Sequence, residues 1–171
     1  FVGQNGQGKS TLAKMMVGEI PFEGLLKLGH NVEVGYFAQN QSEHLPPEKT
    51  VLEIMEDAAT DGNRMRVRDM LGSFLFGGDA ADKKAKVLSG GERNRLALCK
   101  LLLAPFNVLI MDEPTNHLDI ASKNVLKEAL KSFNGTLILV SHDRDFLQGL
   151  TSTVYGFKDK EIKEYLGDID Y

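Results

Sequence analysis

The chain has 171 residues, of which 42% are hydrophobic and 26% charged, and its formal net charge is −4. This length fits one domain with a sizeable core, and the charge excludes a strongly basic nucleic-acid-binding surface over the whole chain. No apolar run approaches the roughly 18 residues that a membrane-spanning helix needs. The single cysteine, Cys99, cannot form an internal disulfide, which fits a reducing compartment. We therefore expect a cytoplasmic chain that does not insert into a membrane, with Cys99 packed in its core.

The N-terminal part predicts a strand, a glycine-rich loop and a helix. Phe1 and Val2 read as the tail of a strand, residues 3–8 as the loop, and residues 9–17 as a helix that ends at Gly18. Two short strands are expected next, at 25–28 and 32–37. Because the chain opens inside a strand and without Met, we expect it to be a piece of a longer protein.

The middle of the chain predicts helices. Thr50 and Glu53 have the spacing of a capping box that opens a helix, and residues 63–76 read as another helix. Residues 90–104 form an amphipathic helix that ends before Pro105. The region from about 50 to 87 therefore resembles a helical subdomain inserted between two strand-rich parts.

The C-terminal part alternates strands and helices. The expected order is strand 107–112, helix 121–133, strand 136–141, helix 143–150, and strands 153–158 and 161–166. This alternation predicts an α/β fold in which helices cover both faces of a parallel sheet.

The loop from Gly3 to Ser10 has the pattern G-x-x-x-x-G-K-S of a phosphate-binding P-loop. Glycines allow backbone N–H groups to surround phosphates, and the helix that follows presents its positive end to them. Lys9 is expected to reach the β- and γ-phosphates of ATP and Ser10 to ligate Mg²⁺. The residues that we assign to the nucleotide are Gly3, Asn5, Gly6, Gly8, Lys9, Ser10 and Thr11.

Two adjacent carboxylates, Asp112 and Glu113, follow the apolar run 108–110. Ligands of open α/β sheets bind at the carboxyl ends of the strands, and a P-loop needs a second metal-holding carboxylate on another strand. We expect Asp112 to hold Mg²⁺ and Glu113 to polarise the water that attacks the γ-phosphate. The alternative is an ordinary solvated strand end.

A second anion-binding helix start is predicted at Ser89, Gly90 and Gly91. Ser89 can cap the helix 90–104, and the two glycines leave backbone N–H groups uncovered. The alternative is a helix that Ser89 caps with no ligand.

These motifs, taken in order, resemble the nucleotide-binding domain of the ATP-binding-cassette (ABC) superfamily, a P-loop NTPase with an inserted helical subdomain. The resemblance covers essentially the whole chain. Its elements are the P-loop 3–10, the Q-loop with Gln39, the signature 88–92, the Walker B strand and carboxylates 108–113, the D-loop around Asp119, and the switch histidine His142.

Finer residues resemble the ABC-F class. They are the runs Glu113–Asp119, Leu88–Arg93, Ser141–Leu147 and Tyr165–Gly167. ABC-F proteins carry two cassettes in one chain and no membrane domain, and the characterised ones act on the ribosome, in translation or antibiotic protection. Only residues 40–87 separate Gln39 from the signature, which leaves no room for the arm of many first cassettes. The second cassette is therefore expected.

The resemblance implies further roles. Gln39 contacts Mg²⁺ and the attacking water, and His142 binds the γ-phosphate and holds Glu113. The Ser89–Gly91 segment and Asp119 face the ATP of a second cassette, because two cassettes pair head to tail. By its position after a strand and before Asp143, His142 is favoured as functional over a plain loop histidine.

The resemblance also implies the domain boundaries. Residues 1–171 are expected to be a partial nucleotide-binding domain, with its core at 1–45 and 88–171 and its helical subdomain at about 46–100. The N-terminal strands of such a domain, which carry an adenine-stacking aromatic residue, are expected to be missing. We therefore expect the isolated chain to hydrolyse ATP slowly or not at all.

Three functions remain open: a cassette of a ribosome-associated ABC-F ATPase, the ATPase subunit of a membrane transporter, and a nucleotide switch without turnover. A basic cluster could contact RNA, although a solvated helical face is the simpler interpretation. Its members are Lys83, Lys84, Lys86, Arg93 and Arg95.

Overall fold

The computed structural model describes residues 1–38 and 40–169. These residues fall into two compact units. The first unit comprises residues 1–39, 106–115 and 133–171, and the second comprises 40–105 and 116–132. The first unit contains the elements β1 (Val2–Gly3), α1 (Lys9–Met16), β2 (Val34–Phe37), β3 (Val108–Asp112), β4 (Thr136–Val140), α6 (Arg144–Leu147), β5 (Thr153–Lys158) and β6 (Glu161–Leu166).

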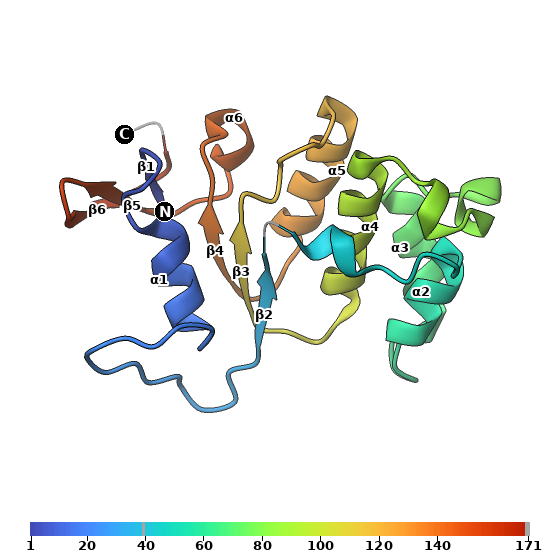
Figure 1. Ribbon diagram of the computed structural model, residues 1–171, viewed down its shortest axis with the longest axis horizontal. Coiled ribbons are helices and arrows are strands. Elements are labelled where there is room, and N and C mark those ends of the chain that lie inside the picture. Colours follow the sequence, from blue (N-terminus) through green and yellow to red (C-terminus); the bar gives the residue numbers. More distant parts are fainter. Residues whose placement is uncertain (39, 170–171) are drawn as a thin grey trace. The chain divides into compact units, whose positions relative to one another are not determined.

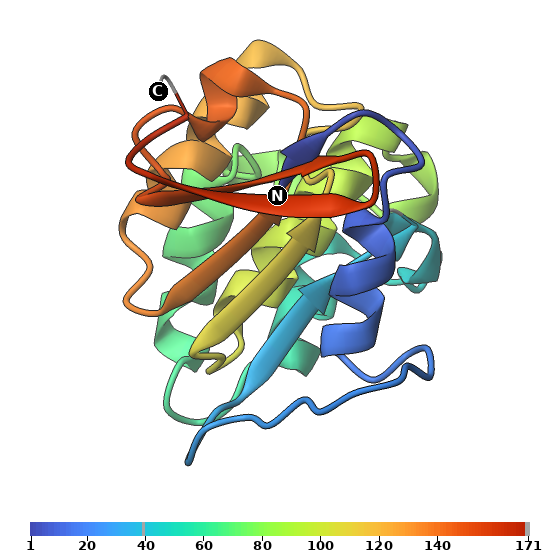
Figure 2. The ribbon, with the colours of Figure 1, turned by 90° about the vertical axis from the view of Figure 1, so that its left-hand side faces the viewer.

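In the first unit, β2, β3 and β4 form a parallel sheet in that order, with Val34 opposite Val108 and Asp112 opposite Val140. The three strands lie side by side and point the same way in Figures 1 and 2. Strands β3 and β4 are almost continuously apolar, as expected for parallel strands buried on both faces. The predicted parallel sheet is therefore present, and the P-loop NTPase fold class is confirmed.

The remaining described strands form a second set, in the order β1-β5-β6. Strand β1 is parallel to β5. Strands β5 and β6 form an antiparallel hairpin, which is drawn in orange-red and red in Figure 2. The hairpin turn consists of Asp159 and Lys160, whose φ angles are 50° and 66°. Positive φ at both central residues is typical of the two-residue turns that match strand twist. Two backbone hydrogen bonds join Phe1 to the end of β4: Phe1 N to Leu139 O at 2.6 Å and Ser141 N to Phe1 O at 3.5 Å.

The strand expected at residues 25–28 is absent, which corrects the sequence prediction. Leu25 is 92% exposed and Leu28 50%. Among the residues that the structure describes, no strand pairs with this segment, so its backbone has no ladder to join. The later strand, expected at 32–37, is shortened to Val34–Phe37.

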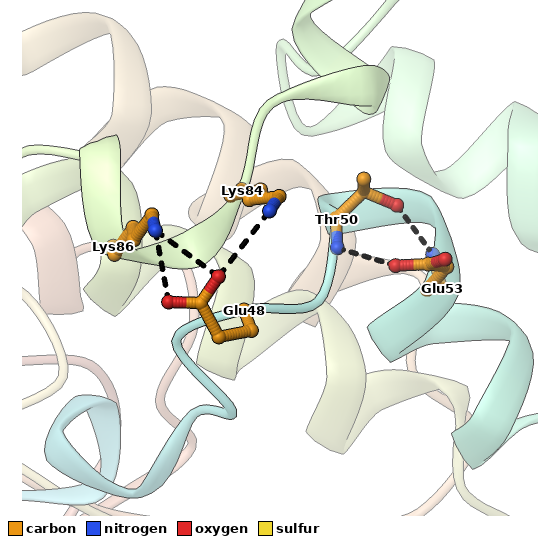
Figure 3. Close-up of polar contacts among 5 residues, drawn as sticks. All are labelled: Glu48, Thr50, Glu53, Lys84 and Lys86. Atoms are coloured by element: carbon orange, nitrogen blue, oxygen red, sulfur yellow. Dashed lines mark hydrogen bonds and ion pairs between the residues drawn. The ribbon is translucent and has the colours of Figure 1, made fainter.

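The second unit contains the helical elements. They are η1 (Gln41–His44), α2 (Val51–Ala58), η2 (Arg64–Arg66), α3 (Val67–Ser73), η3 (Gly78–Asp82), η4 (Ala85–Val87), α4 (Gly90–Leu103) and α5 (Ile120–Lys131). The predicted capping box opens α2: the Thr50 hydroxyl accepts from Glu53 N, and the Glu53 carboxylate accepts from Thr50 N (Figure 3).

Two helices are shorter than predicted, for local reasons. The helix expected at 63–76 is a 3₁₀ turn followed by α3, which ends because Leu75 adopts a φ of 66°. Phe76 N then donates to Leu71 O and Leu75 N to Gly72 O, the bond pair of a Schellman motif. The helix expected at 143–150 ends at Leu147, and the amide of Gly149 donates instead to the Asp168 carboxylate at 2.6 Å. The other predicted boundaries differ by one or two residues.

Cys99 lies in α4 with no exposed surface, as predicted, and burial raises the pKa of its thiol to about 12. A thiol in this state is not a nucleophile at neutral pH, so Cys99 is a packing residue. Across the described residues, no helix combines the length and apolar character that a membrane span requires.

Gly135→Ala should destabilise the first unit by about 1–3 kcal/mol, the usual cost of overpacking. A Cβ at Gly135 would lie 2.4 Å from the backbone O of Asn107, which cannot move away without disturbing the bonds it makes. Asn107 accepts from Thr136 N and donates to Glu33 O, and so ties together the starts of the three parallel strands. Chemical denaturation of the purified protein measures the change.

Gly72→Ala is the matched control. Gly72 is exposed within α3 and a Cβ there meets nothing within 4 Å. The same substitution should leave stability unchanged or raise it by up to about 1 kcal/mol, because alanine favours helix. Equal destabilisation by the two variants would show that the contact with Asn107 O is unimportant.

Candidate functional site

The P-loop turns directly into α1. Gly8 is the N-cap of α1 with a φ of 95°, and Gly6 has a φ of 81°. A Cβ at either glycine would meet nothing within 4 Å, so their backbone conformation is what requires glycine there. The loop is thereby bent so that the first turn of the helix, with its unbonded N–H groups, is open to an anion.

Lys9 is held by its own loop. Its ammonium donates to Gly3 O at 2.7 Å and to Gln4 O at 2.9 Å, and the residue is only 5% exposed. Gly3 is needed for a further reason: a Cβ on it would lie 2.3 Å from Phe157 O of the neighbouring strand β5. Gly3 is thus a packing residue that also supplies an acceptor to Lys9.

The two predicted carboxylates differ in backbone conformation: Asp112 ends strand β3, whereas Glu113 follows the strand in a left-handed conformation. Asp112 is the last residue of the strand and is 4% exposed. Glu113 follows with a φ of 48°, and its N–H donates to Val140 O at 2.7 Å. A left-handed conformation is costly for a residue other than glycine, so the strand bond to Val140 must help to maintain it.

The structure brings Glu113 and His142 together. His142 Nε2 lies 3.3 Å from Glu113 Oε1, and His142 N donates to Glu113 Oε2 at 3.4 Å. The loop that carries His142 is fixed on both sides, since Asp143 N donates to Ser141 Oγ and Phe146 N donates to Asp143 Oδ1. Glu113 is therefore oriented by a histidine whose own backbone is well supported.

These residues surround one cavity of about 410 Å³ within the first unit. It combines the phosphate-loop residues with the ends of β3 and β4. Its lining residues are Asn5, Gly6, Gly8, Lys9, Ser10, Thr11, Asp112, Glu113, Val140 and His142. Val140 was not predicted, although its position just before Ser141 and His142 at a strand end would have suggested it.

The donor set of this cavity fits a magnesium ion accompanied by phosphates. Asp112 Oδ1 is buried and has no hydrogen-bond partner among the described groups, which calls for a cation or ordered water. Mg²⁺ is commonly held by one or two carboxylates together with substrate phosphates. Ser10 supplies a hydroxyl to the same cavity. Within the described residues, no cluster of three or more His, Cys, Asp or Glu would hold a metal by itself.

Burial raises the pKa of Glu113, and the neighbouring carboxylate of Asp112 adds to this effect. His142 and Lys9 act in the opposite direction but do not offset the burial. A carboxylate with a raised pKa is a better proton acceptor when ionised than a solvated one, as a general base requires. Glu113 therefore has the environment expected of a base.

The second unit holds the other predicted residues. Ser89 caps α4 through a capping box with Glu92, whose carboxylate accepts from Ser89 N at 3.2 Å. Gly90 has open space where a Cβ would be, whereas a Cβ at Gly91 would lie 2.7 Å from His117 O. Asp119 caps α5 by accepting from Ser122 N at 2.7 Å, and hydrogen bonds from the side chain and then the backbone of Ser122 lower the pKa of its carboxyl.

Gln39, predicted to contact Mg²⁺ and the attacking water, lies outside the described residues.

The predicted basic cluster is only partly a basic surface. Arg95, assigned to the basic cluster, is instead buried, with its Nη1 donating to Ser122 Oγ at 2.9 Å and its guanidinium 4.6 Å from the Phe76 ring centroid. Lys84 and Lys86 are exposed, but both bind the Glu48 carboxylate (Figure 3), at 3.2 and 2.8 Å. The basic character of this surface is thus reduced.

The sequence matches the family described as ABC transporter over residues 1–116. ABC transporter F family member 5 of Arabidopsis thaliana is 46% identical over 173 residues, covering 100% of this chain and 25% of the relative. Family member 2 of the same plant is 45% identical, with 100% and 26% covered, and ATP-binding protein Uup of Haemophilus influenzae is 44% identical, with 98% and 27% covered. The chain thus spans about a quarter of the length of these relatives.

Two solved structures share the fold. One is a dimeric ATP-binding cassette in a post-hydrolysis state bound to ADP and Pi, with a TM-score of 0.72, 23% identity, and 96% of this chain and 82% of that chain covered. The other is RNase-L Inhibitor, with a TM-score of 0.75, 25% identity, and 97% and 34% covered. Family match, relatives and fold agree: the chain belongs to the ATP-binding-cassette family, and its sequence places it with the ABC-F members.

Proposed function

We propose that this chain binds and hydrolyses ATP as one cassette of an ABC-F protein. The single observation that carries the proposal is the cavity in which the P-loop, Asp112, Glu113 and His142 meet. Lys9 and the start of α1 supply positive charge for the phosphates, and the two carboxylates supply a metal ligand and a base. Phosphate binding, metal binding and proton transfer are thus assigned to different side chains.

In this proposal Glu113 orients a water and accepts its proton while the water oxygen attacks the γ-phosphorus; the bond from that phosphorus to the β–γ bridging oxygen breaks, and ADP leaves. His142 keeps the Glu113 side chain in place and faces the phosphate. Ser10 and Asp112 would hold Mg²⁺, with Gln39 as a further ligand; a bound Mg²⁺ neutralises charge on the phosphates. Lys9 would exchange its bonds to Gly3 O and Gln4 O for bonds to the phosphates.

We further propose that the chain works in a head-to-tail pair with a second cassette. The support is Ser89–Gly91, an open capped helix start that belongs to a unit other than that of the P-loop. In such a pair, Ser89–Gly91 and Asp119 bind the ATP of the companion cassette. ATP then favours the closed pair and hydrolysis the open one, a ligand-driven population shift.

The ribosome is the proposed site of action of the complete protein, in translation or antibiotic protection. The support is the similarity to ABC-F proteins and the ABC-F residue pattern 113–119. The alternative is the ATPase subunit of a membrane transporter, which the name of the matched family favours. The two differ in what ATP controls: association with ribosomes or with a membrane partner.

Glu113→Gln should lower ATP turnover by at least about a hundredfold, because it removes the base while keeping the shape. ATP binding should persist, and the cassette pair should remain closed. Turnover and nucleotide retention of the complete two-cassette protein measure both effects. Glu56→Gln, at an exposed position of α2, is the matched control and should leave turnover unchanged. Normal turnover in Glu113→Gln would remove Glu113 from the mechanism.

Glu113→Gln should also stabilise the nucleotide-free protein at neutral pH. The folded state raises the pKa of Glu113, so the stability associated with its protonated form is complete at low pH and is lost as pH rises through the folded-state pKa. Glutamine does not undergo this loss. The melting temperature of the variant should therefore exceed that of the wild type at pH 7.5, with a difference that shrinks towards pH 4. A constant difference across this range would contradict the proposed burial effect.

The complete protein should co-sediment with ribosomes when ATP is present, and more strongly in the Glu113→Gln form, because that form stays closed. Lys9→Ala should abolish the nucleotide dependence by weakening phosphate binding. Sucrose-cushion sedimentation with ATP, ADP or no nucleotide tests this. ATP-dependent recovery in membranes, without ribosomes, would favour the transporter alternative instead.

A further inference from the structure

One face of α4 contacts the loop that carries Asp119. Gly91, Asn94 and Arg95 are spaced by three and four residues, so they lie on the same side of the helix. Each of them meets the segment 116–122, which belongs to the same unit. The function proposed above uses Ser89–Gly91 and Asp119, and leaves Asn94 and Arg95 without a role.

The first contact is a close backbone approach. A Cβ on Gly91 would be 2.7 Å from His117 O, a distance that no side chain tolerates. His117 itself has a φ of 64°, which turns the loop at this point. The loop is thus pressed against the first turn of α4, and Gly91 is required for that approach.

The second contact is a hydrogen bond from a buried amide. Asn94 is 6% exposed, and its Nδ2 donates to Asn116 O at 3.0 Å. Asn116 O is a backbone atom of the loop, so this bond fixes the course of the chain rather than a side chain. Loss of a buried bond of this kind leaves a polar group unsatisfied.

The third contact joins Arg95 to the helix that Asp119 caps. Arg95 Nη1 donates to Ser122 Oγ at 2.9 Å, and Ser122 N donates to Asp119 Oδ1 at 2.7 Å. The guanidinium lies over the Phe76 ring at 4.6 Å, which holds it in place from the other side. The charge of Arg95 also lowers the pKa of Asp119.

We propose that Asn94 and Arg95 are positioning residues that lock the Asn116–Asp119 loop to the signature helix. The helix start and Asp119 then present a single preformed surface to the nucleotide of the companion cassette. This inference rests on the proposed pairing of cassettes. Preorganisation of this kind lowers the entropy that closure must overcome, so its loss should weaken closure rather than nucleotide binding by the chain's own P-loop.

The test uses the complete two-cassette protein in the Glu113→Gln form, with a fluorescent donor and acceptor on the two cassettes to report closure. Asn94→Asp replaces the amide donor by an acceptor facing Asn116 O. It should raise the ATP concentration for half-maximal closure about tenfold. Hydrogen exchange of the amides at 117–119 should accelerate by a similar factor. Affinity for ADP should change less than about twofold, because ADP needs only the chain's own P-loop.

Lys100→Ala, on the exposed side of α4, is the matched control and should alter none of these quantities. If Asn94→Asp also loses ADP binding, it is misfolded, and Ser122→Ala decides, because it removes the hydroxyl that links Arg95 to the Asp119 carboxyl. Ser122→Ala should shift closure in the same direction. Unchanged closure in a variant that still binds ADP would overturn the positioning role. Absence of ATP-dependent closure in the parent protein would instead overturn the proposed function.

Discussion

The contact on which the nucleotide site depends is a small apolar cluster beneath it. Ala13 of α1 packs with Ile110 of β3 and Val140 of β4, and all three are at most 1% exposed. Alanine allows the helix to approach the strands closely. Since the P-loop is the start of α1 and the carboxylates follow Ile110, this packing sets how the phosphate-binding groups lie relative to Asp112 and Glu113. The register of β3 on β4 completes the arrangement, because it places Val140 where it can bind Glu113 N.

The site carries costs that the surrounding elements must offset. Glu113 combines a left-handed backbone with a carboxylate whose ionised form burial disfavours. Asp112 keeps a buried oxygen without a partner among the described groups. Strain and unsatisfied groups of this kind persist only where the neighbouring structure enforces them. Here the parallel sheet does so, because the bonds of β3 to both of its neighbours fix the strand that ends in these residues.

The sequence was sufficient for features that depend on local chemistry. The P-loop, the capping box at Thr50, the cap at Ser89 and the carboxylates at the end of β3 follow from residue type and spacing, and all lie on the predicted elements. The sequence prediction failed where the structure of a segment depends on residues far away in the chain. Residues 25–28 have the composition of a strand, but a strand requires a neighbour. Arg95 resembled part of a basic surface because helical phase alone does not reveal Phe76 and Ser122 beside it.

The two glycines of the signature, Gly90 and Gly91, have different structural roles that the motif alone does not distinguish. In the sequence the two residues look equivalent, because both lack a side chain that would cover the backbone N–H groups at the helix start. In the structure only Gly91 is constrained by a neighbouring atom, His117 O. If this helix start binds an anion as proposed, the glycine pair combines two requirements: access for that anion and close packing of a loop against the first turn. The second requirement involves His117, a residue far along the chain, and so only the folded unit reveals it. The signature sequence thus also encodes a packing contact with the loop that carries Asp119.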